Sequence, residues 1–328
     1  MVYNIIMKSR KPHAKRFERD TTGTPRMRLT SRDVAILRHV SRHRFLSSKQ
    51  IMTLVGDSPR IVRRLQALFH AGYLDRPRAQ LVYYATAGSE PLVYALARKG
   101  AQVLAETDGE SADAYRWTLK NKRAGQTFVQ HTIEAADILV RLSASERARR
   151  GVRLVAEEQI LAEAPAATRA LAQPHKVTVD VDWGGKRYKL SVIPDAVFAL
   201  EFGDDILAPL ERANFVLELD RETMPVMRKS RSLDKHSRQT SILSKLLTYH
   251  RAWRSKLHTE RYSWENFRVL TVTTSEQRVK SMIDAVKEIT EGRGSALFLF
   301  TTSEQLKRAD ILSAEWLNGK GERVTLTE

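Results

Sequence analysis

Three arginines share the polar side of one predicted helix, residues 60–69: Arg60, Arg63 and Arg64. The apolar residues of this segment recur at the i, i+4, i+7 spacing of a single buried face, at Ile61, Leu65 and Leu68. A guanidinium can hold a phosphate or bond bidentately to guanine. We therefore regard the three arginines as candidate DNA-binding residues, and the sequence does not say which of them would contact a base.

The distribution of charge supports the same chemistry. The 328 residues include 55 Lys+Arg and 38 Asp+Glu, which gives a net charge of +17 and a pI near 10.1. Residues 1–28 (net +6) and 221–256 (net +8) together supply +14 of that excess. Such a patchy distribution favours a phosphate-binding surface over general solubility. Further candidate DNA contacts are Lys8, Arg10, Lys11, Arg26 and Arg28 in the first stretch, and Arg228, Lys229 and Arg231 in the second.

Composition excludes several other classes of protein. The chain has no cysteine, so disulfide scaffolds, thiol nucleophiles and cysteine-ligated metals are ruled out. It has no apolar window of about 18 residues, which argues against a membrane span and favours the cytoplasm. It also lacks a P-loop, a dinucleotide fingerprint, an H-E-x-x-H motif and a G-x-S-x-G motif.

Caps and periodicity predict the elements around the arginine-bearing helix. Residues 1–28 show little apolar periodicity and are expected to form a flexible arm. The expected elements that follow are a helix begun by the capping box Thr30–Asp33, a helix after Ser47, the helix 60–69, strands over 81–86 and 92–96, and a helix from near Arg98.

This order of elements resembles a winged helix-turn-helix over residues 29–106. The phrase Tyr94-Ala95-Leu96-Ala97-Arg98-Lys99-Gly100 resembles the one that leaves the wing in many bacterial regulators. The resemblance implies that helix 60–69 enters the major groove of double-stranded DNA, commonly as a homodimer. The predicted helix 126–150 would be an available dimer interface. The alternative is a small helical domain whose arginines form a solvated face.

After a polar linker, 107–125, a second domain is expected over 126–328, and the overall fold class is α/β (α+β overall) with a mixed sheet. The predicted elements are a helix over 126–150, a strand over 152–160, a hairpin over 177–193 that turns at Gly184-Gly185, strands over 196–200 and 214–220, a helix over 237–257, a strand over 267–273, a helix over 275–289 and a strand over 296–301.

The order of these elements resembles the αβββαβ core of restriction-endonuclease-like, PD-(D/E)xK proteins. The matching residues are Pro194-Asp195, which begin one strand, and Glu218-Leu219-Asp220, which end another. In nucleases of that family, two acids on strands hold Mg²⁺ and a lysine positions or activates water. The resemblance implies Asp195 and Glu218 as metal ligands, and Asp195, Glu218, Asp220 and Lys245 as the catalytic set.

The sequence departs from the family pattern at the lysine. Asp220 stands where the lysine belongs, and Lys245 of the next predicted helix is its candidate replacement, with Tyr249 one turn further. His131 and Glu134, three residues apart on the first helix of the domain, could add a polar group and an acid.

Two interpretations of these acids stay open. As a nuclease, the domain would nick or cleave DNA with Mg²⁺. As a binding or assembly module, it would pair the same acids with arginines of 221–231 and have no enzymatic activity. We favour the second interpretation because the lysine is displaced and because fold analogy does not carry activity.

A wider resemblance is to replication-relaxation family proteins of bacterial plasmids and mobile elements, and it spans residue 29 to about residue 305. The order of several phrases carries it: Leu29–Leu37, Arg44–Leu46, Ala71–Pro77, Tyr94–Gly100, His131-Thr132, Pro194–Phe198, Glu218–Thr223, Lys245–Tyr249 and Val272–Ser275. The resemblance implies a DNA-binding protein of plasmid replication control, mobilisation or transcriptional regulation, with replication or relaxase proteins as partners.

Overall fold

The chain has a mixed α/β fold, which confirms the predicted class. The computed structural model describes residues 16–20, 27–80, 91–109, 121, 123–203, 211–226 and 241–327, and these contain eleven α-helices and a seven-stranded mixed sheet. No described helix combines the length and the apolar character that crossing a membrane requires. The predicted strand 81–86 and several basic candidates lie outside the described residues: Lys8, Arg10, Lys11, Arg26, Arg228, Lys229 and Arg231.

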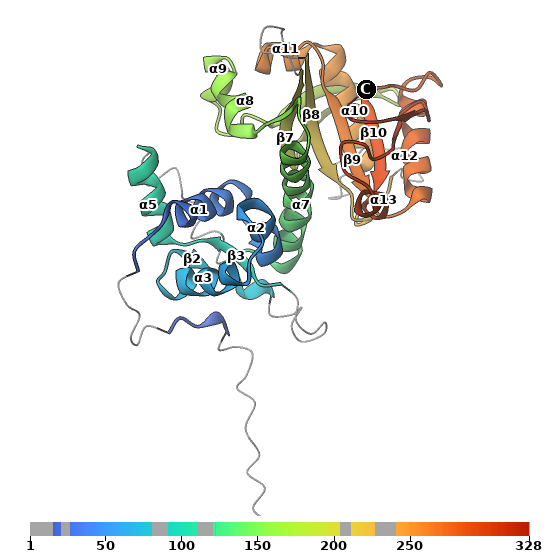
Figure 1. Cartoon of the computed structure of the whole chain (residues 1–328). Helices are drawn as coiled ribbons and strands as arrows, with labels where there is room; N and C mark the ends of the chain where they lie inside the picture. Colours follow the sequence, from blue (N-terminus) through green and yellow to red (C-terminus); the bar gives the residue numbers. More distant parts are fainter. Residues whose placement is uncertain are drawn as a thin grey trace, which may run out of the picture. The chain divides into compact units, whose positions relative to one another are not determined.

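The chain divides into two compact units, residues 1–140 and 141–328, called units 1 and 2 below. In unit 1, β3 is the central strand of a small sheet and pairs antiparallel with β1 and β2. The elements of unit 1 are α1 (Ser31–His43), β1 (Leu46–Ser47), α2 (Ser48–Val55), α3 (Pro59–His70), β2 (Leu74–Asp75), the 3₁₀ helix η2 (Arg78–Gln80), β3 (Val93–Leu96), α5 (Arg98–Asp108) and the first part of α7 (Gln126–Ala148) (Figure 1).

The helix starts of unit 1 follow the caps predicted from the sequence. At α1, the backbone N–H of Asp33 donates to Thr30 Oγ1 (3.3 Å) and the N–H of Thr30 donates to Asp33 Oδ2 (2.7 Å), which completes the capping box. Ser47 begins α2 with an equivalent box, and Ser58 caps α3 ahead of Pro59. The predicted apolar face of α3 is buried, at Ile61, Leu65 and Leu68.

Residues 16–20 are fixed to unit 1, so the expected flexibility of the arm needs correction for this segment. Phe17 is buried. The guanidinium of Arg19 donates to the carbonyl oxygen of Phe69 (3.0 Å) and to Asp75 Oδ1 (2.8 Å). A buried aromatic ring and an arginine that donates to separate acceptors therefore hold this part of the basic stretch, although the stretch has no apolar periodicity.

The sheet of unit 2 has the order β12-β11-β10-β9-β8-β7-β4. Strands β8, β9 and β10 run parallel, and the other neighbours are antiparallel. The elements are the last part of α7, β4 (Val152–Val155), α8 (Glu157–Glu163), α9 (Ala166–Arg169), β5 (Val177–Trp183), β6 (Lys186–Val192), β7 (Ala196–Phe202), β8 (Glu211–Leu219), α10 (Ile242–Arg254), α11 (Leu257–Tyr262), β9 (Arg268–Thr273), α12 (Glu276–Ile289), β10 (Phe298–Thr302), α13 (Ser303–Arg308), β11 (Trp316–Asn318) and β12 (Arg323–Val324) (Figure 1).

One predicted strand of unit 2 is wrong over its second half. The strand expected over 152–160 ends at Val155, and α8 begins at Glu157. Glu157 and Glu158 fall in the first turn of α8, where acids interact favourably with the helix dipole. The predicted hairpin is confirmed, because β5 and β6 pair across Gly184 and Gly185, whose φ values of 58° and 75° suit a tight turn.

The middle strands of the sheet are buried on both faces, which explains their almost continuous apolar runs. One face packs in a single core with α10 and α12, through Val197, Ala199, Val216, Val269 and Phe298. Side chains alternate along a strand, so positions 195, 218 and 220 share the face of 197 and 216. The predicted acids therefore belong to the face that α10 covers.

The contacts of Gly100 generate a prediction about stability. Gly100 lies in the first turn of α5, where an added Cβ would overlap the carbonyl oxygen of Tyr73 and come within 2.8 Å of Leu96 Cδ1. We expect Gly100→Ala to lower the free energy of unfolding by about 1–3 kcal/mol, because overpacking outweighs the helix propensity of alanine. The matched control is Gly125→Ala, whose Cβ would meet nothing within 4 Å. Equal urea midpoints for the two variants would contradict this prediction.

Candidate functional site

The exposed side of α3 carries two of the three predicted arginines. Arg60 and Arg63 are exposed, together with Gln66 and with Val62, which is 43% exposed. We call these four residues the α3 surface. Charge pointed to the arginines alone, whereas Val62 and Gln66 could have been found from their positions off the apolar face of the helix. Guanidinium, amide and methyl groups are the chemistries that read guanine, adenine and thymine in the major groove.

Arg64 is engaged inside unit 1. Its Nε donates to Asp33 Oδ1 (2.7 Å) and its Nη2 lies 2.5 Å from Asp33 Oδ2. The same Nη2 donates to the carbonyl oxygen of Arg28 (2.8 Å), whose own side chain is exposed. Burial would raise the pKa of Asp33, but hydrogen bonds from Arg64 and Thr30 outweigh it, so the pKa lies below its usual value. Arg64 thus ties α3 to the start of α1.

In unit 2, the backbone brings Asp195 beside the end of β8. The N–H of Asp195 donates to the carbonyl oxygen of Leu217 (2.9 Å), which extends the pairing of β7 with β8 by one residue. Asp195 Oδ2 accepts a hydrogen bond from the N–H of Leu219 (2.7 Å). Asp195 and Glu218 therefore come together, as their positions on one face predict.

Glu218 is 3% exposed and has two partners on α10. Lys245 Nζ lies 2.5 Å from Glu218 Oε2, and the hydroxyl of Tyr249 donates to Glu218 Oε1 (2.5 Å). Lys245 and Tyr249 are four residues apart, so one helical face presents both groups. Lys245 thus faces Glu218 from α10. We call Asp195, Glu218, Lys245 and Tyr249 the acidic site.

Burial and charge act in opposite directions on these groups. Burial raises the pKa of Glu218, Asp195 raises it further, and Lys245 opposes both. Burial would lower the pKa of Lys245, but Glu218 and Asp195 outweigh it, so the ammonium stays charged. Burial, reinforced by Glu218, raises the pKa of Tyr249 well above its usual value, which keeps its hydroxyl protonated as a donor.

Asp220 has its own partners. Arg278 Nη2 donates to Asp220 Oδ1 (2.8 Å), and Thr273 Oγ1 donates to Asp220 Oδ2 (2.6 Å). Arg278, on α12, supplies the guanidinium that the sequence analysis expected from residues 221–231, of which 227–231 lie outside the described part. No local spacing pointed to Arg278, because the sheet brings together residues that are 58 positions apart.

The other two predicted site residues lie on the first part of α7. His131 and Glu134 belong to unit 1, whereas the acidic site is described within unit 2. Among the described residues, no group of three or more His, Asp or Glu is arranged to hold a metal ion. Mg²⁺ is often bound by one or two carboxylates completed by substrate phosphates. Asp195 and Glu218 fit that donor set only when Lys245 releases Glu218.

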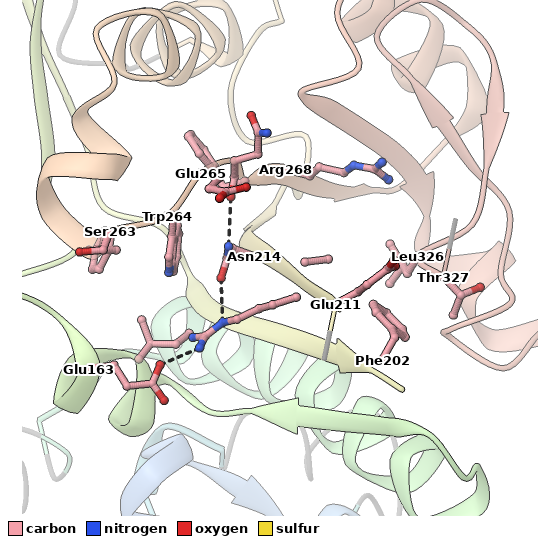
Figure 2. Close-up of a pocket in the computed structure, with 16 residues that line it drawn as sticks. Glu163, Phe202, Glu211, Asn214, Ser263, Trp264, Glu265, Arg268, Leu326 and Thr327 are labelled. Carbon is pink, nitrogen blue, oxygen red and sulfur yellow. Dashed lines mark hydrogen bonds and ion pairs between the residues drawn. The ribbon is translucent and has the colours of Figure 1, made fainter. Parts of the chain in front are cut away.

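A cavity of about 630 Å³ lies at the amino ends of β8 and β9, the opposite end from Glu218 (Figure 2). Arg212 pairs with Glu163 (2.7 Å) and its Nε donates to Asn214 Oδ1 (3.2 Å). The amide of Asn214 donates to the carbonyl oxygen of Asn266 (3.1 Å). These bonds link polar groups of the wall to one another, and no sequence motif pointed to this cavity.

Comparison with known proteins shows the family of this chain. Residues 37–265, which make up more than half of the chain, match the family described as Replication-relaxation. No curated protein and no solved structure gives a significant match. The matched range contains the α3 surface and the acidic site, and it ends before Arg278.

The acidic site generates a prediction with a pH signature. Lys245→Met leaves the buried carboxylate of Glu218 without its cation. We therefore expect the free energy of unfolding at neutral pH to fall by about 3–5 kcal/mol. The folded-state pKa of Glu218 should then rise further above its unfolded value of about 4.3. Between the unfolded pKa and the raised folded pKa of Glu218, the folded state binds one proton more than the unfolded state. The free energy of unfolding should therefore fall as pH rises through this range. Urea unfolding at a series of pH values measures this loss.

The control is the double variant Glu218→Gln with Lys245→Met, which removes both charges and should lose the added pH dependence. A Lys245→Met variant whose stability has the same pH dependence as the wild type would show that the ion pair does not govern the charge of Glu218.

Proposed function

This chain belongs to the replication-relaxation family, and we propose that it is a double-stranded DNA-binding protein of a plasmid or mobile element. Membership of the family suggests a role in plasmid or mobile-element replication or mobilisation. Transcriptional regulation is the further role that we include in the proposal. The observation that carries DNA binding is the α3 surface, where Arg60 and Arg63 are exposed on a helix whose opposite face is buried.

The elements of unit 1 support a winged helix-turn-helix. Along the chain, α1 is followed by β1, α2, α3, β2, β3 and α5, and the three strands pair in the order β1-β3-β2. In this interpretation α3 is the recognition helix and enters the major groove. The predicted wing strand 81–86 lies outside the described residues, so the wing belongs to the proposal.

The arginines of α3 have two different roles in this proposal. Arg60 and Arg63 contact DNA, whereas Arg64 holds α3 against α1 through Asp33. The basic residues 8–15 supply phosphate contacts without sequence specificity, ahead of the anchored segment 16–20. Replication or relaxase proteins, and a second copy of the chain on a two-fold DNA site, are the partners that such a role implies.

Arginine substitutions on α3 test this proposal. We expect Arg60→Ala and Arg63→Ala each to weaken duplex binding by about 1–3 kcal/mol if they contact bases. Arg64→Ala should in addition lower the free energy of unfolding by about 1–3 kcal/mol, since it removes the guanidinium that donates to both oxygens of the buried Asp33. Fluorescence anisotropy, with a duplex selected from a random pool by the wild-type protein, measures the affinities.

The control is Arg98→Ala, which removes the same charge from an exposed position on α5. An unchanged affinity in the variant that combines Arg60→Ala and Arg63→Ala would remove α3 as the recognition element.

A second candidate function is metal-dependent nicking or cleavage of DNA by unit 2. The observation that favours it is the convergence of Asp195, Glu218 and Lys245 at the carboxyl end of β8. In the order of the chain, α7, β4, β7, β8, α10 and β9 follow the αβββαβ pattern of PD-(D/E)xK proteins, with the β5–β6 hairpin as an insertion. Asp195 and Glu218 would hold Mg²⁺, and Lys245 would position or activate water after leaving Glu218.

The two functions make opposite predictions about metal. Nicking requires that millimolar Mg²⁺ or Mn²⁺ raise the melting temperature and support relaxation of supercoiled plasmid, and that Asp195→Ala and Glu218→Ala abolish both effects. A binding module predicts no metal effect and a loss of stability alone in Glu218→Ala, and this is the outcome that we expect. Glu211→Ala, an exposed acid at the other end of β8, is the control.

A further inference from the structure

The last turn of α10 presents an exposed tryptophan among basic side chains. Trp253 is 38% exposed, and Arg251 and Arg254 are exposed beside it. The backbone N–H of Lys256 donates to the carbonyl oxygen of Trp253 (3.0 Å), so this exposed lysine directly follows the helix. The opposite side of the turn is buried, at Thr248, Tyr249 and Ala252. Around the helix, Trp253, His250 and Arg254 therefore follow one another on the solvent-facing side, and Arg251 lies at the far edge of that side.

A neighbouring ring and a second loop complete the surface. The rings of His250 and Trp253 are stacked, with centroids 6.3 Å apart and an interplanar angle of 26°. Burial lowers the pKa of His250, and the positive charges of Arg254 and Arg293 lower it further. Arg293 is exposed and lies 3.5 Å from Glu291 Oε2. Arg293 follows α12, which packs against α10 (Figure 1). We call His250, Arg251, Trp253, Arg254, Lys256 and Arg293 the Trp253 platform.

The setting of Trp253 differs from that of the other exposed large apolar side chains among the described residues. Val62, Leu171 and Ile193 are aliphatic and have no flat ring to offer. Phe128 is aromatic, but the guanidinium of Arg44 lies over its ring, 4.5 Å from the centroid. Trp253 therefore combines an accessible aromatic ring with several exposed cations.

We propose that the Trp253 platform binds single-stranded DNA. An unpaired base would stack on the indole, and Arg251, Arg254 and Lys256 would hold the phosphates on either side. Base stacking on an aromatic side chain next to a cationic track is the physical basis of single-strand binding without sequence preference. A duplex cannot use this surface in the same way, because its bases already stack on one another and present only their edges in the grooves.

This activity goes beyond duplex binding by the α3 surface, and it rests on the proposed function only in taking DNA as the nucleic acid. Trp253 lies eight residues after Lys245 on α10, or about 12 Å along the helix axis. A single strand on the platform therefore passes within a few nucleotides of the acidic site. A protein of replication or mobilisation with this arrangement holds duplex DNA with one unit and an opened strand with the other.

The test compares two probes with the full-length protein: a fluorescein-labelled dT20 oligonucleotide, and a duplex selected by the wild-type protein. We expect Trp253→Ala to weaken binding of dT20 by roughly 10- to 100-fold and to leave duplex affinity unchanged. Trp253→Phe keeps a ring for stacking and should retain most of the dT20 affinity. The paired variant Arg251→Ala with Arg254→Ala should reduce the slope of log K against log salt for dT20 by about 1.4.

Matched controls separate the platform from general charge and from folding. Lys280→Ala with Lys287→Ala removes two exposed charges from α12 and should leave dT20 affinity closer to wild type than the arginine pair does. The thermal unfolding of Trp253→Ala is measured alongside. Quenching of tryptophan fluorescence by dT20 is measured in the wild-type protein, so it does not require that a variant folds. The quenching should be smaller in Trp253→Phe.

The outcomes distinguish this inference from the proposed function. Loss of dT20 binding in Trp253→Ala with unchanged duplex binding supports the platform, even if the α3 variants leave duplex affinity unchanged. Three results would overturn it: a wild-type protein that neither binds dT20 nor is quenched by it, equal dT20 affinity of Trp253→Ala and wild type, or an equal loss on both probes. The first of these would instead favour an acidic protein as the partner of the surface.

Discussion

The burial of Glu218 is the constraint on which the arrangement of unit 2 depends. A carboxylate at 3% exposure on the face of a closely packed sheet is stable only when its charge and its oxygens are matched. Both matching groups, Lys245 and Tyr249, come from one face of α10. α10 must therefore lie with that face over the end of β8. Trp253, four residues after Tyr249, continues the same side of the helix and is exposed one turn further, where α10 ends at Arg254. One buried ion pair thus fixes both the acidic site and the exposed side of the helix.

In unit 1, a buried acid paired with a cation likewise holds α3. Asp33 completes the capping box of α1 and at the same time accepts two hydrogen bonds from Arg64. A residue that local sequence assigns to a cap is also the anchor of the helix that carries Arg60 and Arg63. The orientation of the α3 surface is therefore fixed by a buried acid as well as by apolar packing. In both units, a side chain that stabilises the fold also positions the groups proposed to contact DNA.

Local patterns predicted most of the elements but few of the long-range pairings. The capping boxes, the alternating strands and the Gly184-Gly185 turn depend on neighbouring residues, so periodicity and turn chemistry were sufficient. The facing of Glu218 by Lys245 came from a family resemblance, because 27 residues separate the two. The Asp220–Arg278 pair, the start of α8 at Glu157 and the strands β11 and β12 were missed. A short apolar run is ambiguous between strand and helix, and register across a sheet cannot be read from one strand.

The structure also changes what the basic composition means. A count of +17 treats every lysine and arginine alike, yet Arg64, Lys245 and Arg278 are each matched to a buried acid. In each of these cations a carboxylate replaces part of the hydration shell. A phosphate would have to displace that carboxylate before it could bind the cation. Exposed cations release condensed counterions on binding DNA at no such cost, so the salt dependence of affinity reports on them. Of the arginines on helices α3 and α10, Arg60, Arg63, Arg251 and Arg254 are in that second class. These four arginines lie on the outer sides of α3 and α10, and the inner sides of the two helices are held by Asp33 and Glu218. The buried acids therefore determine which cations are paired inside the protein and which remain exposed to bind DNA.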